Sequence, residues 1–199
     1  MKKLLLTAFE PFGGEDFNSS LLTLTSLPDA IGGFRIIKMV VPVIFSFAPK
    51  TVIDAALKFN PDVILCLGQA EGRSEVTPEK IGINLKNARI PDNAGQEPLN
   101  EAIAEGGPDG LFSTLPVGEM AEAMRTAGVP ASVSYSAGTY VCNDLLYSLL
   151  NHFKDTGTSV GFIHLPLTPE QAASKPDPQP ASLTVEQMTA AVEAAILAL

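Results

Sequence analysis

The residues best suited to covalent chemistry in this sequence are two cysteines, Cys66 and Cys142, and two histidines, His152 and His164. A cysteine thiolate attacks carbonyl carbons readily, and a nearby imidazole is the usual group that takes and returns the proton. If one thiol and one imidazole meet in the fold, the sequence predicts a cysteine hydrolase.

Cys142 is the better candidate nucleophile. It stands two residues after Tyr140, where a helix is predicted to begin. Free backbone N–H groups and the helix dipole favour a thiolate at such a position, and the same N–H groups could hold a developing oxyanion. The alternative is a small buried residue in the first turn of a helix. Cys66 lies within the aliphatic run from Val63 to Leu67, which is typical of an inert core thiol.

His164 is the better candidate base. His152 follows Cys142 on the same predicted helix by ten residues, so it lies roughly 15 Å further along the axis and cannot reach the thiol. His164 ends an apolar run that is predicted to be a buried strand. Its alternative role is a hydrogen-bonded core histidine. A third group, an Asp, Glu or Asn, should orient the imidazole, but the local pattern offers several acids and does not choose among them.

Alternating strands and helices must position these groups. Apolar runs predict strands over 3–9, 35–41, 62–67, 131–135 and 159–165, with a weaker strand over 81–85. Helical patterns cover 18–27, 50–59, 117–127, 141–153 and 184–199, and two long tracts, 87–110 and 166–180, read as loops. This order predicts an α/β fold, a single-domain three-layer α/β/α sandwich over residues 1–199 with a mainly parallel twisted sheet. Sites in such sheets lie beyond the carboxyl ends of strands, which here means after Phe9, Leu67, Tyr135 and Ile163.

The composition narrows the class of protein. A formal net charge of -9 over 199 residues argues against nucleic-acid binding and against docking on an anionic membrane. Two cysteines in a chain of this length do not form a disulfide framework. The apolar start at Leu4 ends at Glu10 without a signal-peptide cleavage site, so we expect a cytoplasmic protein. The scattered cysteines and histidines predict no metal site, and no other cofactor is expected.

Four blocks of the sequence, between Leu4 and Gln171, together resemble the pyroglutamyl peptidase I family, the pyrrolidone-carboxylate peptidases, which are cysteine peptidases. They are TAFEPFGG (7–14) with Asn18; CLGQAEGR (66–73) with VTPEK (76–80) and Asn84; ARIPDN (88–93); and VSYSAGTYVCN (133–143) with FIHLP (162–166) and PEQ (169–171). Each block is moderately specific, and all of them in order and at matching spacing are strongly specific.

The resemblance implies removal of N-terminal pyroglutamate from peptides through an acyl-enzyme. It selects Glu79 as the third group beside Cys142 and His164. It implies that the substrate is held by Phe9, Phe12, Asn18, Gln69, Arg89, Ile90, Tyr140 and Val141. Gln69 has both an amide donor and an amide acceptor for the lactam ring. The resemblance also implies a homo-oligomer, a dimer or a tetramer.

The sequence departs from the family pattern at several positions. Glu71 stands where glycine is usual and Ser19 where proline is frequent, and Leu165 and Leu167 flank Pro166 at variable positions. The rival interpretations are an enzyme that cleaves another amide or ester, a binding protein without turnover, and a thiol redox protein. The absence of a C-x-x-C motif argues against the interpretation as a thiol redox protein. Nucleoside phosphorylases are an analogy of fold alone.

Overall fold

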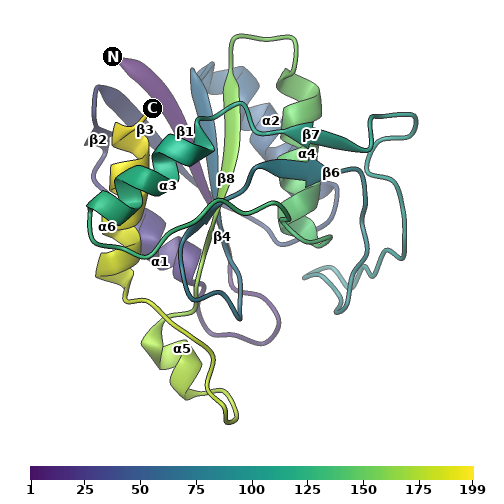
Figure 1. Ribbon diagram of the computed structural model, residues 1–199. Coiled ribbons are helices and arrows are strands. Elements are labelled where there is room, and N and C mark those ends of the chain that lie inside the picture. Colours follow the sequence, from purple (N-terminus) through teal and green to yellow (C-terminus); the bar gives the residue numbers. More distant parts are fainter.

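The computed structural model describes residues 1–199 and is built around a six-stranded sheet of order β2-β3-β1-β4-β8-β5 (Figure 1). Four central strands are parallel to one another: β1 (Lys2–Phe9), β3 (Phe34–Val41), β4 (Val63–Gln69) and β8 (Ser159–Leu165). The short edge strands β2 (Ala30–Ile31) and β5 (Thr77–Pro78) are antiparallel to their neighbours. A separate antiparallel pair joins β6 (Ile81–Ile83) to β7 (Gly110–Phe112).

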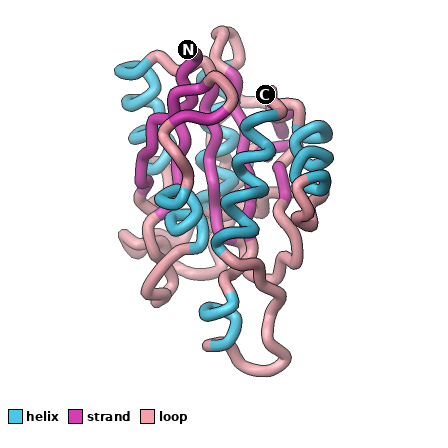
Figure 2. The backbone as a smooth tube through the Cα atoms, turned by 90° about the vertical axis from the view of Figure 1, so that its left-hand side faces the viewer, coloured by secondary structure: helices cyan, strands magenta, loops and turns pink.

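Helices cover both faces of the main sheet. On one face lie α1 (Ser19–Ser26), α3 (Val117–Thr126) and α6 (Val185–Leu197), and on the other lie α2 (Phe47–Phe59) and α4 (Val141–Phe153) (Figure 2). Successive side chains of a strand point to opposite faces. Accordingly Leu4 and Leu6 of β1 join the core under α1, α3 and α6, whereas Leu5 joins the core under α2 and α4. The predicted fold class, a three-layer α/β/α sandwich with a mainly parallel sheet, is confirmed.

The helix α2 begins earlier than its sequence predicts, at Phe47 and not at residue 50. Pro49 lies in its first turn, where a backbone N–H has no intrahelical partner and a proline is tolerated. The chain enters the helix through Ser46, whose φ is 60°. The Ser46 N–H donates to Asp144 Oδ2 at 2.6 Å, so the start of α2 is tied to the first turn of α4.

The strand predicted over 131–135 is wrong. This segment makes only two isolated bridges, Val76 to Ala131 and Glu79 to Ser134. Pro78 lies between the two bridged positions and has no N–H with which to continue a ladder. The weaker strand over 81–85 is confirmed only over Ile81–Ile83.

The tract 166–180 is not entirely loop, because it contains the short helix α5 (Pro169–Ala173). Thr168 and Gln171 form its capping box, and Pro169 occupies its first turn. This signal is present in the sequence. The last helix also begins with a capping box, formed by Thr184 and Gln187. No helix of the fold combines the length and the apolar character needed to cross a membrane.

Candidate active site

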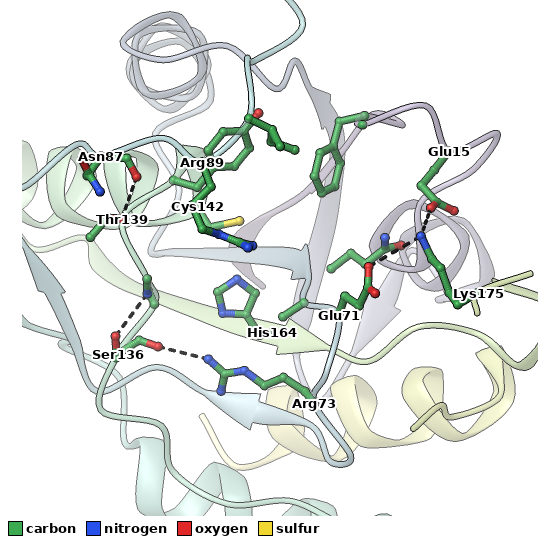
Figure 3. A pocket seen from close by; sticks show the side chains of 18 residues that line it. Glu15, Glu71, Arg73, Asn87, Arg89, Ser136, Thr139, Cys142, His164 and Lys175 are labelled. Carbon is green, nitrogen blue, oxygen red and sulfur yellow. Dashed lines mark hydrogen bonds and ion pairs between the residues drawn. The ribbon is translucent and has the colours of Figure 1, made fainter. Parts of the chain in front are cut away.

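A cavity of about 500 Å³ lies beyond the carboxyl ends of β4 and β8 (Figure 3). It is lined by residues from both ends of the chain and from the loop before α4. Its walls include Phe12, Glu15, Gln69, Glu71, Arg73, Asn87, Arg89, Ile90, Ser136, Thr139, Tyr140, Cys142, His164 and Lys175. Segments after β1, β4 and β8 therefore meet at one site, as the sequence predicts. The segment after Tyr135 also reaches this cavity although no strand precedes it.

Cys142 is the second residue of α4 and is half-buried. Its sulfur and the imidazole of His164 face the same cavity (Figure 3). Space for the sulfur comes from Gly68 at the end of β4. A Cβ at position 68 would lie 3.1 Å from Cys142 Sγ and 2.7 Å from Phe162 Cζ. A glycine at this position therefore lets the nucleophile candidate lie against the end of the sheet.

The thiol of Cys142 is held protonated in the resting site. Burial raises its pKa to about 12, and the charge of Glu79 adds to the rise, while Arg73 and the backbone N–H of Cys142 itself lower it. The expectation of a thiolate stabilised by the helix N-terminus is therefore wrong, because desolvation outweighs the backbone N–H. A nucleophilic role for this thiol requires a base to take its proton.

His164 is oriented by a buried carboxylate. In the sheet it lies opposite Gly68 of β4 and Thr77 of β5. Its Nδ1 is 2.7 Å from Oε1 of Glu79, which is 0% exposed. A carboxylate accepts and does not donate, so Nδ1 carries the proton and Nε2 is the nitrogen left to act as a base.

The position of Glu79 follows from the edge strand. Its backbone N–H donates to Phe162 O at 2.9 Å, immediately after β5 pairs with β8. This pairing brings the Glu79 side chain within hydrogen-bond distance of the imidazole of His164, although the two residues are 85 positions apart in the sequence.

Arg73 is a second partner of Glu79 that sequence reasoning missed. Its Nη2 donates to Glu79 Oε1 at 2.9 Å and to Ser136 O at 3.0 Å, and its Nη1 donates to Thr77 Oγ1 at 2.6 Å. Arg73 stood in the second sequence block without a role. The available signal was a cation six residues before the candidate acid. Since Arg73 and His164 share one carboxylate oxygen, Arg73 offsets the charge that Glu79 presents to the thiol.

A smaller hollow adjoins Cys142 and contains most of the predicted substrate-binding residues. Its volume is about 10 Å³, room for roughly one water molecule. It is lined by Phe9, Phe12, Asn18, Val43, Gln69, Tyr140, Val141 and Cys142. Arg89 and Ile90 line only the larger cavity.

The walls of this hollow differ in how firmly they are held. Phe9 and Val141 are 3% and 0% exposed and belong to the hydrophobic core. Phe12 and Tyr140 are half-buried, with ring centroids 6.1 Å apart, and the Tyr140 hydroxyl donates to Pro91 O at 2.9 Å. Phe12 and Tyr140 are therefore the less deeply buried walls of the hollow.

Two amide side chains of the hollow are already committed to the fold. Asn18 caps α1, and its Oδ1 accepts from Ser20 N at 3.0 Å and from Ser20 Oγ at 2.7 Å. Gln69 Oε1 accepts from Ser19 N and from Gln171 Nε2, both at 2.8 Å. The expectation that Gln69 offers both a donor and an acceptor is therefore wrong, since only its Nε2 group is left for a ligand.

Glu71, the departure from the family pattern, lies at the mouth of the large cavity. Its Oε2 is 3.6 Å from Lys175 Nζ, which also pairs with Glu15 (Figure 3). Lys175 thus links the loop after β1 to the loop after β4. The charge that Glu71 adds is partly matched by this cation.

A thiol and an imidazole that face one cavity, with a buried carboxylate behind the imidazole, have the layout of a cysteine hydrolase on an α/β sandwich. The profile of the family described as pyroglutamyl peptidase matches residues 2–199. Pyrrolidone-carboxylate peptidase 1 of Caldanaerobacter subterraneus subsp. tengcongensis is 45% identical over 196 residues, covering 98% of this chain and 96% of that protein. A pyrrolidone-carboxylate peptidase of Staphylococcus haemolyticus is 46% identical over 200 residues, covering 99% and 93%.

Solved structures give the same result. Pyroglutamyl peptidase I of Bacillus amyloliquefaciens superposes with a TM-score of 0.94 at 40% identity, covering 100% of this chain and 96% of that chain. The pyrrolidone carboxyl peptidase of Thermococcus litoralis gives a TM-score of 0.95 at 36% identity, covering 100% and 93%. The chain belongs to the pyroglutamyl peptidase family and is an enzyme of the cysteine peptidase class.

Proposed function

We propose that this enzyme removes pyroglutamate from the N-terminus of peptides through a Cys142–His164–Glu79 triad. The observation that carries the proposal is the 2.7 Å contact between His164 Nδ1 and the buried Glu79, which leaves Nε2 as the basic nitrogen at a cavity shared with Cys142.

In the first step His164 Nε2 takes the proton of Cys142 as Sγ attacks the carbonyl carbon of the pyroglutamyl residue. The carbonyl oxygen becomes an oxyanion. The backbone N–H of Cys142 interacts with its own thiol and lowers the pKa of that thiol, and this N–H is proposed to bind the oxyanion. Arg89, which is exposed and lines the cavity, is a further candidate for this role.

In the second step the imidazolium of His164 gives its proton to the leaving amine, and the C–N bond breaks to leave a thioester on Cys142. Water, deprotonated by His164, then hydrolyses the thioester and releases pyroglutamate. Glu79 holds the ring in the required tautomer and stabilises the imidazolium in both halves of the reaction.

The substrate ring is proposed to enter the small hollow beside Cys142. The ring is larger than this hollow, so Phe12 and Tyr140 move aside while Phe9 and Val141 stay fixed in the core. Asn18, Ile90 and Gln69 complete the binding residues. An uncharged lactam suits walls that are mainly apolar with a single amide donor.

The test is the release of aminocoumarin from its pyroglutamyl and prolyl amides by the reduced wild-type protein, Cys142→Ser and Cys66→Ser. We expect turnover selective for the pyroglutamyl amide that is lost in Cys142→Ser and kept in Cys66→Ser, because Cys66 is fully buried. Equal turnover of the two amides, or activity that survives Cys142→Ser, would contradict the proposal.

The homo-oligomeric state and the cytoplasmic location stay predictions. Light scattering measures the mass of the particle in solution and so tests the homo-oligomeric state.

A further inference from the structure

Gln171 is a buried residue of α5 that lines neither hollow of the site yet contacts Gln69, one of the two amide side chains that are committed to the fold. It is 2% exposed. Its Oε1 accepts from Thr168 N at 3.1 Å, and its Nε2 donates to Phe17 O at 3.1 Å and to Gln69 Oε1 at 2.8 Å. All three bonds are mutually consistent in only one orientation of the Gln171 amide, since the Thr168 N–H requires an acceptor and Phe17 O requires a donor.

This orientation fixes the polarity of Gln69. Gln69 Oε1 faces two donors, the backbone N–H of Ser19 and the Nε2 of Gln171. If the Gln69 amide rotated by 180°, its N–H₂ group would face both donors, and two buried hydrogen bonds would be lost. The Nε2 of Gln69 must therefore be the end directed away from Ser19 and Gln171, and Gln69 lines both hollows beside Cys142.

We propose that Gln171 is a specificity-positioning residue, which holds the Gln69 amide so that its N–H₂ group donates to the ring carbonyl of pyroglutamate. The inference rests on the proposed function. A five-membered ring without the carbonyl places a methylene against this donor and leaves it unpaired, so the site rejects that ring. Gln171 touches no substrate and acts only through Gln69.

The experiment compares two aminocoumarin amides, pyroglutamyl and cyclopentanecarbonyl, which differ in the lactam group. The first variant is Gln171→Met, which removes the donor without adding charge. The second is Gln171→Glu, which keeps an acceptor for the Thr168 N–H and replaces the donor with another acceptor. In both we expect kcat/KM for the pyroglutamyl amide to fall about ten- to hundredfold, with little change for the cyclopentanecarbonyl amide.

The chain provides a matched control in Gln187, which occupies the same capping-box position in α6 and is exposed. Gln187→Met and Gln187→Glu remove or alter the equivalent capping box of α6, and Gln187 does not contact Gln69. The ratio of kcat/KM for the two amides should therefore not change in these variants. In a Gln69→Met background, Gln171→Met should have no further effect on the ratio, because the amide that it orients is absent.

Each outcome decides the question. A selective wild type with an equally selective Gln171→Met overturns the positioning role alone. A fall in activity on both substrates by the same factor also overturns it, since that is the signature of general damage to the fold. A wild type that does not distinguish the two substrates overturns the proposed function and this inference together.

Discussion

The tight contact at Gly68 makes Gly68→Ala the most informative perturbation of the nucleophile. The added methyl carbon would lie 2.7 and 2.9 Å from Cζ and Cε1 of Phe162 and 3.1 Å from Cys142 Sγ. Favourable carbon contacts begin near 3.5 Å, so one partner must move by roughly 0.5–1 Å. Phe162 is 1% exposed and its ring packs against Phe9 and His164, with centroids 6.4 and 4.8 Å away, so the sulfur takes part of the displacement.

Two quantities follow from this overpacking. The free energy of unfolding should fall by about 1–3 kcal/mol, which lowers Tm by roughly 2–12 °C for a domain of this size. The value of kcat should fall about 100-fold, because a nucleophile misplaced by about 1 Å loses its alignment with the carbonyl and the base. The assays are thermal unfolding and turnover of pyroglutamyl-aminocoumarin per folded molecule.

The control is Gly161→Ala, on β8. There an added Cβ would also collide with a buried side chain, Leu115, whose Cγ would be 2.9 Å away, but no residue of the site is involved. We expect a similar loss of stability with activity within a few-fold of wild type. If Gly68→Ala is destabilised yet keeps wild-type kcat, the view that Gly68 makes room for the sulfur is refuted.

Three further predictions concern the charges and thiols around the site. Glu79→Gln should lower kcat about 10²- to 10⁴-fold, since His164 loses the anion that stabilises its imidazolium; unchanged kcat would remove Glu79 from the mechanism. Arg73→Gln should raise the pKa of Cys142 further and slow its alkylation by iodoacetamide at fixed pH, because Arg73 lowers that pKa; faster alkylation would show the opposite coupling. Burial raises the pKa of Cys66 from 9.0 to about 12, so its contribution to stability is present below pH 9 and is lost as pH rises toward 12. Between pH 9 and pH 12 the free energy of unfolding, measured with denaturant, should fall by about 1.4 kcal/mol per pH unit more in the wild type than in Cys66→Ala. Parallel pH profiles of the two proteins would show that burial does not raise the pKa of Cys66.

The parts of the molecule that were predictable from sequence are those whose signal is local. The bounds of α4 and β8 follow from continuous periodicity or apolar character, and with them the places of Cys142 and His164. Glu79 could not be chosen from its neighbours. It is buried because the two-residue strand that contains Pro78 pairs with β8 at the edge of the sheet. A strand of two residues is too short to give a periodic pattern in the sequence.

Other features depend on contacts between distant segments. Gln171 meets Gln69 across 102 positions, and its capping box predicts a helix but no partner beyond it. The pKa of Cys142 is raised, whereas the position at a helix start predicts a lowered pKa, and the reason is similar. The helix start is visible in the sequence, whereas the depth of burial that dominates the pKa is a property of the assembled fold.

The position of β8 in the sheet has a consequence for how the chain is made. It is the last strand in the sequence, yet it pairs with β4 on one side and β5 on the other. During synthesis β4 and β5 therefore leave the ribosome before β8, the strand that joins them. Until β8 is made, one edge of β4 is unpaired, although every residue of β4 is buried in the complete fold. Such an edge is prone to pair with another chain. A protein cut before Ser159 should aggregate and be inactive, and in the growing chain the peptidase site comes into existence only when the strand bearing His164 is inserted between its neighbours.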